Sequence, residues 1–457
     1  MSQGKKEEYV KILTEQIRCK QARAQVAQEI RSHIEEQENY FLGEGLTREE
    51  AENEAVKEMG DPVEAGAALD LVHRPRVAWG WIALIGILYA AGYALLSLLQ
   101  SNFSEEDFIT GGYGKWMLVG MAVMVGVCYA DYSRIGRWAR EITTAVFVVL
   151  FGGMYLFGQQ VNGALQWLNL PFLSASLNIQ LLCFLFVPLY AAIVYHYHGQ
   201  GYLAVGKCFL WMLPALCITL RIPSVVTAMM LYLTFLLILS FAMIRGWFQG
   251  SKGKMLASAW GGTMLLAGIG YLKLFLSGPA YQYTRVRNLL HPGSGEAGYQ
   301  IRMLRGILDG SRWIGGGEGV SAVKAVDGLM SGMDYSLLYI IACYGILAAI
   351  LAIGLLVGVF VYFMGMSVGQ KNHLGNIIGF GCTAVLIVQI MFYVLVNTGV
   401  IPSGTVYCPF LTSGGTGVLV TNTLIGILLS IYRYQDVPLD VEKGNVRRFL
   451  PVGRTAF

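Results

Sequence analysis

The strongest constraint on the fold of this chain is a succession of apolar stretches, each long enough to cross a bilayer. A helix needs about 20 predominantly apolar residues to span the hydrocarbon core. From Val77 onward the sequence contains about ten such stretches, each of roughly this length. They centre on residues 78–99, 114–131, 141–159, 177–196, 203–220, 224–244, 256–277, 335–361, 374–398 and 414–432. The sequence therefore predicts an all-α polytopic membrane protein.

The composition agrees with this prediction. Apolar residues make up 55% of the chain and charged residues only 14%, whereas a soluble protein carries about 25% charged residues. Most of the cysteines fall within apolar stretches and none has metal-ligand spacing, so we interpret them as small core residues and predict no metal site from them. Only Arg221-Ile222-Pro223 separates the fifth stretch from the sixth, so these two could also form one bent span.

The first 75 residues differ in kind from the rest, because they are rich in Glu, Lys, Arg, Gln and Ala. Val26, Ile30 and Ile34 recur every four residues and give one helix an apolar stripe. Thr47 and Glu50 have the spacing of a capping box at the start of another helix. This segment is predicted to be a small soluble helical domain.

The run LTREEAENEAVKEMGDP, followed by His73-Arg74-Pro75, resembles the prefix domain that precedes some bacterial permease-like proteins. The resemblance covers only this segment and implies a regulatory or assembly role. A solvated helical cap without a ligand remains the alternative interpretation.

The distribution of Lys and Arg predicts the orientation in the membrane. Basic residues gather after the second and sixth stretches and in the C-terminal tail, which puts both termini in the cytoplasm. We therefore expect a cytoplasmic helical domain at 1–75, a membrane domain at 76–435 whose large loop 278–334 lies outside, and a cytoplasmic tail at 436–457. The basic residues in question are Arg134, Arg137, Arg140, Arg245, Lys252, Lys254, Lys443, Arg447, Arg448 and Arg454.

The large loop is the longest polar interruption between the predicted spans, and it is basic although it is predicted to lie outside. Its glycines, Gly315, Gly317 and Gly319, lie close in sequence to several charged residues. Glycine clustered with charge between two spans suggests a backbone shaped around a ligand.

Two separate regions resemble the FtsW/RodA/SpoVE family. GYQ at 298–300, the three glycines just named, and Met333-Asp334-Tyr335 at the start of a span resemble the large external loop of that family. Further on, Gln389 and the run CPFLTSGG at 408–415 resemble a family motif in which Thr412 replaces a serine. Glycine-driven backbone packing is our interpretation of the final Ser-Gly-Gly, because no histidine is suitably placed to activate that serine.

The resemblance covers roughly residues 78–435 and implies a membrane glycosyltransferase of the bacterial plasma membrane. Such an enzyme polymerises lipid II into glycan strands during cell division, cell-shape maintenance or sporulation, usually beside a single-pass transpeptidase. A sugar hydroxyl attacks an anomeric carbon whose leaving group is a lipid pyrophosphate, so a carboxylate must accept the hydroxyl proton. Cationic groups, a divalent metal ion or both would stabilise the departing pyrophosphate.

The candidate base is Glu296. The family carries its proposed catalytic aspartate about five residues before the glycine of GYQ, and Gly293 occupies that position here. Glu296 is the nearest acid and could substitute through its longer side chain. An ordinary exposed loop glutamate is the alternative.

The other candidate residues are predicted substrate contacts. Two arginine pairs could hold the pyrophosphate. The first pair, Arg285 and Arg287, could equally reach lipid headgroups. The second pair is spaced three residues apart and would share one helix face. Lys273 would lie near the outer end of the seventh span. Asp334 could stabilise a helix N-terminus instead of contacting substrate. These residues are Arg285, Arg287, Arg302, Arg305, Lys273 and Asp334.

Several departures from the family pattern keep other functions open. The family's PSExxK segment corresponds to residues 175–180, which have neither the acid nor the lysine. A pair of family acids becomes Ala342-Cys343, and Tyr393 stands where an asparagine is expected. A non-catalytic scaffold or binder of lipid-linked precursors, and a flippase for such precursors, are therefore the alternative hypotheses.

Overall fold

The computed structural model describes residues 4–100, 110–161, 164–169, 176–222, 224–277, 296–324, 335–370, 372–401 and 404–435. The chain forms two compact units. One consists of Met1–Ala78 together with Ile431–Phe457, and the other is Trp79–Ser430.

Four amphipathic helices form the N-terminal unit: α1 (Lys5–Glu15), α2 (Lys20–Gly43), α3 (Arg48–Glu58) and α4 (Pro62–Val72). The predicted apolar stripe of Val26, Ile30 and Ile34 is buried, and Leu13 of α1 and Ala55 of α3 are also buried. The predicted helical stripe is therefore confirmed. This core is small and mostly aliphatic, and it also includes the buried ring of Tyr9.

The first turns of α3 and α4 are capped, and the cap of α3 is the predicted capping box. The Thr47 amide donates to the Glu50 carboxylate at 3.0 Å, which completes the capping box of α3. Asp61 accepts a hydrogen bond from the Val63 amide at 2.8 Å and so caps α4, with Pro62 in the first turn. Local chemistry thus fixes where α3 and α4 begin.

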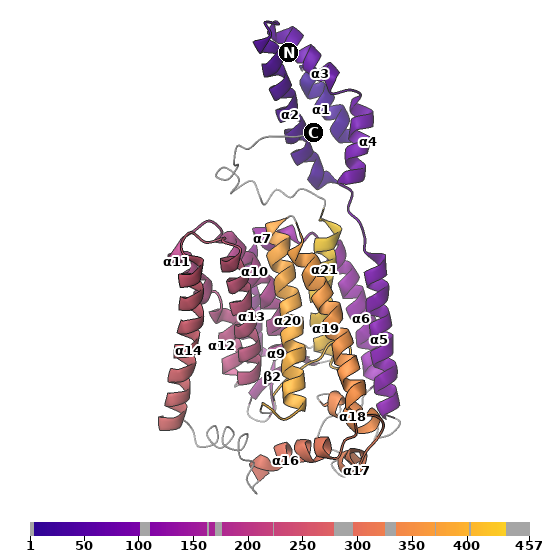
Figure 1. The fold of residues 1–457 in the computed structure, drawn as a ribbon, viewed down its shortest axis with the longest axis vertical. Coiled ribbons are helices and arrows are strands. Elements are labelled where there is room, and N and C mark those ends of the chain that lie inside the picture. Colours follow the sequence, from indigo (N-terminus) through magenta and orange to yellow (C-terminus); the bar gives the residue numbers. More distant parts are fainter. Residues whose placement is uncertain are drawn as a thin grey trace. The chain divides into compact units, whose positions relative to one another are not determined.

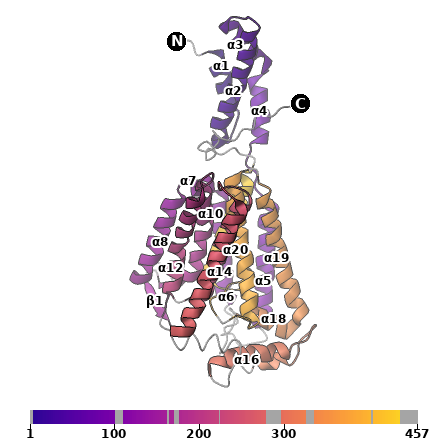
Figure 2. The same cartoon turned by 60° about the vertical axis from the view of Figure 1, so that its left-hand side comes forward.

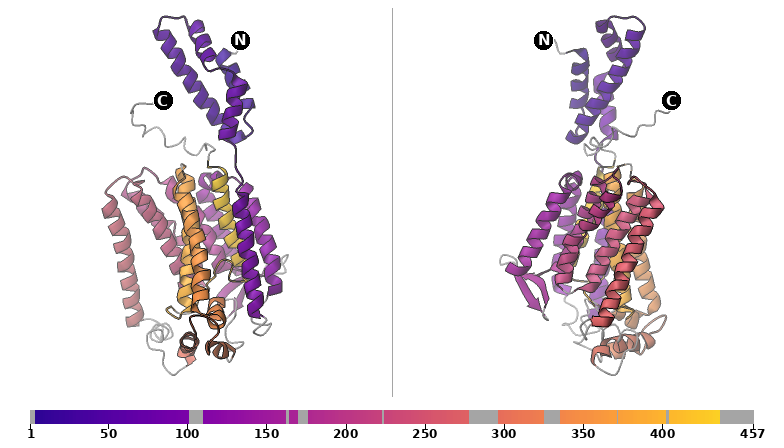
Figure 3. Two further views of the ribbon diagram at one scale, coloured as in Figure 1. Left: turned by 45° about the vertical axis from the view of Figure 1, so that its right-hand side comes forward. Right: turned by 90° about the vertical axis from the view of Figure 1, so that its left-hand side faces the viewer.

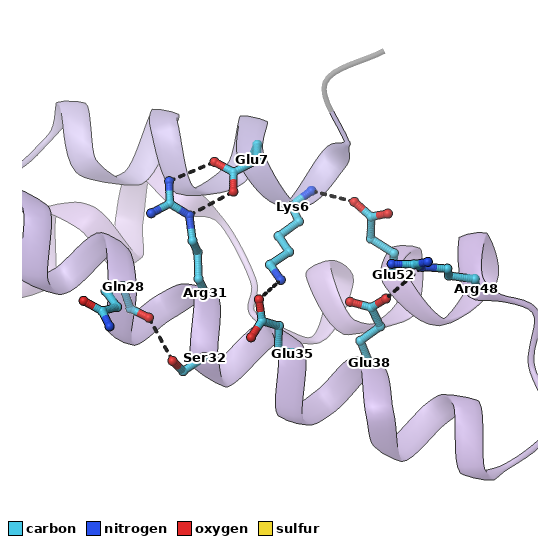
Figure 4. A network of polar contacts seen from close by, with 9 residues as sticks. All are labelled: Lys6, Glu7, Gln28, Arg31, Ser32, Glu35, Glu38, Arg48 and Glu52. Carbon is cyan, nitrogen blue, oxygen red and sulfur yellow. Dashed lines mark hydrogen bonds and ion pairs between the residues drawn. The ribbon is translucent and has the colours of Figure 1, made fainter. Parts of the chain in front are cut away.

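An exposed network of ion pairs links helices of the N-terminal unit (Figure 4). The Arg31 guanidinium donates two hydrogen bonds of 2.9 Å to Glu7, and this contact lowers the pKa of the Glu7 carboxyl. Lys6 pairs with Glu35 at 2.6 Å. Exposed pairs of this kind stabilise a fold by about 0–1 kcal/mol each, so the aliphatic core contributes more than this network.

The second unit is a bundle of long apolar helices. Most predicted spans correspond to single helices, and two consist of shorter helices in succession. The single helices are α5 (Trp79–Gln100), α6 (Thr110–Tyr129), α8 (Ala139–Leu156), α13 (Val225–Ile244), α14 (Lys252–Ser277), α19 (Ile346–Val368), α20 (His373–Asn397) and α21 (Gly415–Arg433). The others are α9 (Ile179–Leu182), η1 (Cys183–Leu185) and α10 (Phe186–His196), then α11 (Tyr202–Leu210) and α12 (Leu213–Arg221).

Within the described residues, nine stretches are long and apolar enough to cross a membrane. The 26-residue helix α14 lies at the position of the seventh predicted span but is not among the nine. The fifth and sixth predicted spans are separate rather than one bent span, because α12 ends at Arg221 and α13 begins at Val225. The protein is thus a polytopic, mostly helical membrane protein, as predicted.

Helices α10, α13 and α20 pack against one another and form the interior of the bundle. In an 18-residue window of the span Ile179–His196, 83% of the residues are buried. In the corresponding window of Ile346–Val368 only 22% are buried. In water such an exposed apolar helix would be unstable, but hydrocarbon is a suitable surrounding for it. The outer helices therefore face lipid.

The structure differs from the all-α prediction by a small antiparallel sheet between α8 and α9. It contains β1 (Gly158–Val161), β2 (Ala164–Asn169) and β3 (Ser176–Asn178) in the order β1-β2-β3. The third predicted span included residues up to 159, but α8 ends at Leu156. A short run of alternating residues between two spans is a weak signal, which the strong apolar periodicity around it obscures.

The eighth predicted span, 335–361, is also wrong in its boundaries. A short helix α18 (Ser336–Tyr344) ends at Gly345, whose φ of +96° breaks the helix, and the spanning helix α19 begins directly afterwards. Helix α18 does not span the membrane itself. It lies with α16 (Glu296–Asp309) and α17 (Gly319–Lys324) across one end of the bundle (Figures 1 and 2).

The sheet lies at this same end, whereas the short helix α7 (Ser133–Arg137) lies at the other (Figures 1 and 3). We call the end with α16, α17 and α18 the loop end of the bundle. Of the predicted loop 278–334, the structure describes residues 296–324. Both regions that resemble the family motifs reach the loop end.

Candidate functional site

Part of the chain between α20 and α21 runs through the protein interior without regular structure. We call residues 404–414 the buried segment. Cys408 is 0% exposed and Thr412 only 3% exposed, and their neighbours are similarly buried. Irregular backbone inside a membrane protein is tolerated only where protein buries it or where it lines a cavity. This segment is therefore the first candidate for a functional site.

A pair of reciprocal hydrogen bonds closes the central turn of the buried segment. The Thr412 amide donates to the Cys408 carbonyl at 3.1 Å, and the Cys408 amide donates to the Thr412 hydroxyl at 3.1 Å. A serine hydroxyl could accept the same bond. The threonine that replaces the family serine thus keeps the group on which the turn depends.

Phe410 fixes the buried segment to α5 and α6. It adopts a left-handed φ of +67°, which is rare for a residue with a side chain. Its ring packs edge-on against Tyr89 at 4.6 Å, and its carbonyl accepts a hydrogen bond from the Tyr113 hydroxyl at 3.2 Å. A Cβ atom at Gly92 would overlap the Phe410 carbonyl oxygen. The glycine on α5 is therefore required by the backbone of the buried segment.

Glycines at the start of α21 likewise allow close packing of the backbone against neighbouring groups. A Cβ at Gly415 would overlap the ring of Trp116, and one at Gly417 would overlap the ring of Tyr407. Gly415 thus lets α21 approach a ring of α6, and Gly417 lets it approach a ring of the buried segment. Close packing of backbone accounts for these glycines.

A chain of hydrogen bonds joins α18 to the buried segment through α20. Ser336 donates to the Leu411 carbonyl at 2.7 Å, so the Tyr393 hydroxyl, 2.7 Å away, must donate to Ser336. The Tyr393 oxygen in turn accepts from the Leu337 amide at 3.0 Å. Asn397 accepts from the next amide along α18. Tyr393 therefore provides a hydrogen-bond acceptor for a backbone amide in the first turn of α18, in addition to filling the core.

The small sheet contacts the same region from the other side. Gln166 of β2 donates to the Thr405 hydroxyl at 3.3 Å, and the Asn178 amide at the end of β3 donates to Thr416 at 2.9 Å. The Asn178 side chain also caps α9 by accepting from the Gln180 amide at 2.9 Å. The sheet thus connects α9, the buried segment and α21.

The polar groups buried in the bundle are neutral. Within the described residues, Asp70 of the N-terminal unit is the only buried acid. Oxygens of Gln180, Gln389 and Asn422 are buried without a hydrogen-bond partner in the described part of the chain. Buried polar atoms are normally paired, so these amides mark places for water or a ligand. They can donate and accept hydrogen bonds but cannot remove a proton.

Helix α16, at the loop end, is attached by one apolar stripe. Ile301, Leu304 and Ile307 are buried. Leu304 lies against the backbone just after α20, because a Cβ at Gly399 would be 3.7 Å from it. The opposite face of α16 is polar. This attachment is much lighter than that of the buried segment.

The glycine-rich part of the loop, residues 310–319, folds back on the chain's own backbone. The Gly319 amide donates to the Gly310 carbonyl at 3.0 Å, and the Gly315 amide donates to Tyr344 at 3.0 Å. A Cβ at Gly345 would lie 2.7 Å from the Trp313 carbonyl. Gly315 thus packs against the junction of α18 and α19, whereas Gly317 and Gly319 pack against backbone of residues 307–310. The prediction that these glycines shape the backbone around a ligand stays a prediction.

The structure places three of the predicted site residues on α16. Glu296 is its first residue, although its side chain lies outside the described part of the chain. Arg302 is half-buried and Arg305 is exposed. Each arginine directly follows a residue of the buried stripe, Ile301 or Leu304, so both lie on the same flank of α16. The shared face expected for this pair is present.

The remaining predicted site residues are not gathered there. Lys273 is exposed on α14, which packs against α13. Arg285, Arg287 and Asp334 lie outside the described residues. Their predicted roles stay predictions.

The described residues offer no metal site of their own. No group of three or more His, Cys, Asp or Glu side chains in the described ranges could hold a metal ion. A divalent ion would therefore depend on substrate pyrophosphate oxygens or on side chains outside those ranges. The predicted possibility of a divalent metal gains no support from the described geometry.

Sequence reasoning missed the structural importance of Tyr393, Asn397 and Ser336. One signal was present, because polar residues inside an apolar span are expensive unless they are paired. The spans 374–398 and 335–361 contain these polar groups. Their partners could not be deduced, because they lie 56–75 residues apart in sequence and meet only in the folded bundle.

The fold and the site define a class: a polytopic membrane protein with a buried irregular segment before its last span and short helices across one end. The family model of the FtsW/RodA/SpoVE cell cycle proteins matches residues 76–437. The chain therefore belongs to the FtsW/RodA/SpoVE family, and it is a bacterial membrane protein.

Individual relatives are distant. The chain is 23% identical over 404 residues to the probable peptidoglycan glycosyltransferase FtsW of Pseudomonas fluorescens, with 82% of this chain and 91% of that one covered. A chain from a peptidoglycan synthase complex, described as coordinating polymerization and crosslinking, has a similar fold. Its TM-score is 0.65 at 16% identity, with 79% of this chain and 99% of that one covered. The rod-shape determining protein RodA of Thermus thermophilus has a TM-score of 0.52 at 16% identity, with coverage of 79% and 97%.

Proposed function

We propose that this protein polymerises a lipid-linked glycan precursor of the lipid II type in peptidoglycan assembly, at the loop end of the bundle. The observation that supports this most directly is α16, which carries an acid at its start and two arginines on one flank. Its relatives are named as probable peptidoglycan glycosyltransferases. The loop end would then face outward and both termini would be cytoplasmic, in accord with the positive-inside pattern.

In this proposal Glu296 removes the proton from the attacking sugar hydroxyl. Arg302 and Arg305 stabilise the pyrophosphate that leaves from the anomeric carbon, with Arg285, Arg287 and Lys273 as further cationic candidates. Asp334 supports the start of α18 or contacts the substrate. A single-pass transpeptidase is the expected partner, because the similar solved chain comes from a complex that couples polymerization to crosslinking.

The test is polymerisation of purified lipid II by the protein with candidate transpeptidase partners, analysed on a gel. Glu296→Gln should abolish the polymer, since general-base catalysis contributes about 10²–10⁴-fold. Glu318→Gln, an exposed acid of the same loop end, is the matched control and should polymerise normally. Polymer of unchanged length and amount from Glu296→Gln would remove this residue from the mechanism.

A non-catalytic precursor binder is the second candidate, and two observations favour it. No acid is buried in the described part of the bundle, and glycine occupies the position of the family's proposed catalytic aspartate. Neutral amides such as Gln180 and Gln389 could still bind a sugar without performing chemistry.

Gly293→Asp distinguishes the two candidates. If the wild type binds lipid II without making polymer while Gly293→Asp polymerises it, the protein is a binder that has lost its base. If the wild type polymerises lipid II and this activity depends on Glu296, then Glu296 is the general base in place of an acid at position 293. A transporter gains no support, because no ion pair is buried within the described spans.

A further inference from the structure

A second cluster with unused chemistry lies at the opposite end of the bundle, around Tyr197. The Arg140 guanidinium lies 5.2 Å from the centre of the Tyr197 ring, and the Lys207 ammonium lies 5.9 Å from it. The Tyr197 hydroxyl accepts a hydrogen bond from the Trp211 indole at 3.2 Å, which holds the ring in place. Two cations from α8 and α11 are thus positioned on one aromatic residue.

These cations lack carboxylate partners. No ion pair within the described residues includes Arg140 or Lys207. The Nε atom of Arg140 is buried and has no hydrogen-bond acceptor in the described part of the chain. A buried cationic donor that is left unsatisfied costs free energy. The arrangement therefore suits an anion that is not part of the chain.

A groove of about 640 Å³ runs along α8 directly from Arg140. Its lining changes from polar to apolar in the direction of the bilayer: Arg140 and Glu141 at the helix start, then Thr144, Ala145, Val148 and Val149. Helix α8 stands at the edge of the bundle (Figure 2), and Val149 is 69% exposed. The Thr144 hydroxyl is already bonded to the Arg140 carbonyl, so Arg140 is the donor that remains for a ligand.

We propose that this groove binds an anionic phospholipid from the leaflet at this end of the bundle. Its phosphate accepts hydrogen bonds from Arg140, Lys207 adds positive potential, and an acyl chain lies along Ala145, Val148 and Val149. The groove is lined by α8 alone, and basic residues at a membrane surface attract anionic headgroups by about 1 kcal/mol each. A soluble phosphate ester would leave the apolar part of the groove unused, whereas a lipid occupies both parts. Glu141 is the one acid in the lining and disfavours a headgroup with more than one phosphate close to it.

The test is titration of delipidated protein in detergent with dioleoyl phosphatidylglycerol and, separately, with dioleoyl phosphatidylcholine, followed by native mass spectrometry. The wild type should bind the anionic lipid more tightly. Arg140→Gln and Lys207→Gln should each weaken that binding about fivefold, which corresponds to about 1 kcal/mol per cation. Neither change should affect the zwitterionic lipid.

Arg137→Gln is the matched control, because Arg137 is exposed at the same end of the bundle and does not line the groove. It should leave both affinities unchanged. Lys207 is exposed, so its replacement tests the proposal even if Arg140→Gln impairs folding. The proposal is overturned if the wild type shows no preference for phosphatidylglycerol, if Arg137→Gln has the same effect as Lys207→Gln, or if equimolar inorganic phosphate displaces the lipid.

Discussion

The buried segment, residues 404–414, and the α16–α17 region, residues 296–324, both carry motifs of the same family, yet they are built in opposite ways. The buried segment is enclosed by helices, the sheet and a continuous series of hydrogen bonds, and all its side-chain polar groups are neutral. The α16–α17 region is charged, and α16 is attached by a single apolar stripe. The first maintains the architecture, and the second holds the groups that could perform chemistry.

This difference explains how the chain can keep the family fold while it departs from the family's charged positions. An exposed acid of the described loop end, such as Glu318, can be lost without removing packing or leaving a buried charge, so we expect such a loss to leave folding unaffected. A change in the buried segment would leave backbone groups unsatisfied. The two regions therefore respond to substitution in different ways, and the following predictions test that contrast.

The largest effect is expected for Gly92→Ala. Its Cβ would overlap the carbonyl oxygen of Phe410, so either α5 or the buried segment must move. We expect destabilisation of about 3 kcal/mol and a clear fall in the thermal unfolding midpoint, measured by intrinsic fluorescence in detergent. Gly80→Ala on the same helix is the control, because a Cβ there meets nothing within 4 Å. Equal midpoints for the two variants would contradict the tight packing.

Tyr393→Phe should have the next largest effect. It removes the hydroxyl that accepts a hydrogen bond from the Leu337 amide and donates one to Ser336. The loss leaves buried polar groups unsatisfied, at a cost of about 2 kcal/mol in the free energy of unfolding. The same unfolding measurement applies. Tyr362→Phe, at a side chain that is 56% exposed, should be neutral. A neutral Tyr393→Phe would show that α18 does not depend on this hydroxyl.

Thr412 offers a matched pair of substitutions. Thr412→Val keeps the shape but removes the acceptor for the Cys408 amide, so we expect a loss of about 1 kcal/mol. Thr412→Ser keeps the hydroxyl that the family motif uses and should lose less. If Thr412→Ser is less stable than Thr412→Val, the hydroxyl is not what stabilises the turn.

The smallest effect on global stability is expected in the α16–α17 region. Leu304→Ala weakens the attachment of α16 near Gly399 but should lower the unfolding midpoint little, because α16 lies at the end of the bundle. Hydrogen exchange should instead increase locally in α16, as expected for a segment that opens without global unfolding. Asp309→Asn, at an exposed residue of the same helix, is the control and should leave exchange unchanged. A large global destabilisation by Leu304→Ala would remove the contrast between the two regions.

The sequence by itself determined the class of fold, the approximate position of most spans and the helical N-terminal unit with its caps. Each depends on local information: the apolar length required by a bilayer, the four-residue spacing of Val26, Ile30 and Ile34, and the reach of Glu50 back to Thr47. The sequence also located both family motifs. It placed Arg302 and Arg305 on one face because helical geometry is local.

Only the tertiary structure decided which residues those motifs contact. The break at Gly345 depends on backbone near Trp313, and the role of Tyr393 depends on Ser336 and Leu411. The overlap at Gly92 likewise depends on the rare backbone conformation of Phe410. Such contacts join positions far apart in the chain, and no periodicity in the sequence encodes them. The physical reason is that satisfying buried polar groups and backbone close-packing are properties of the assembled bundle.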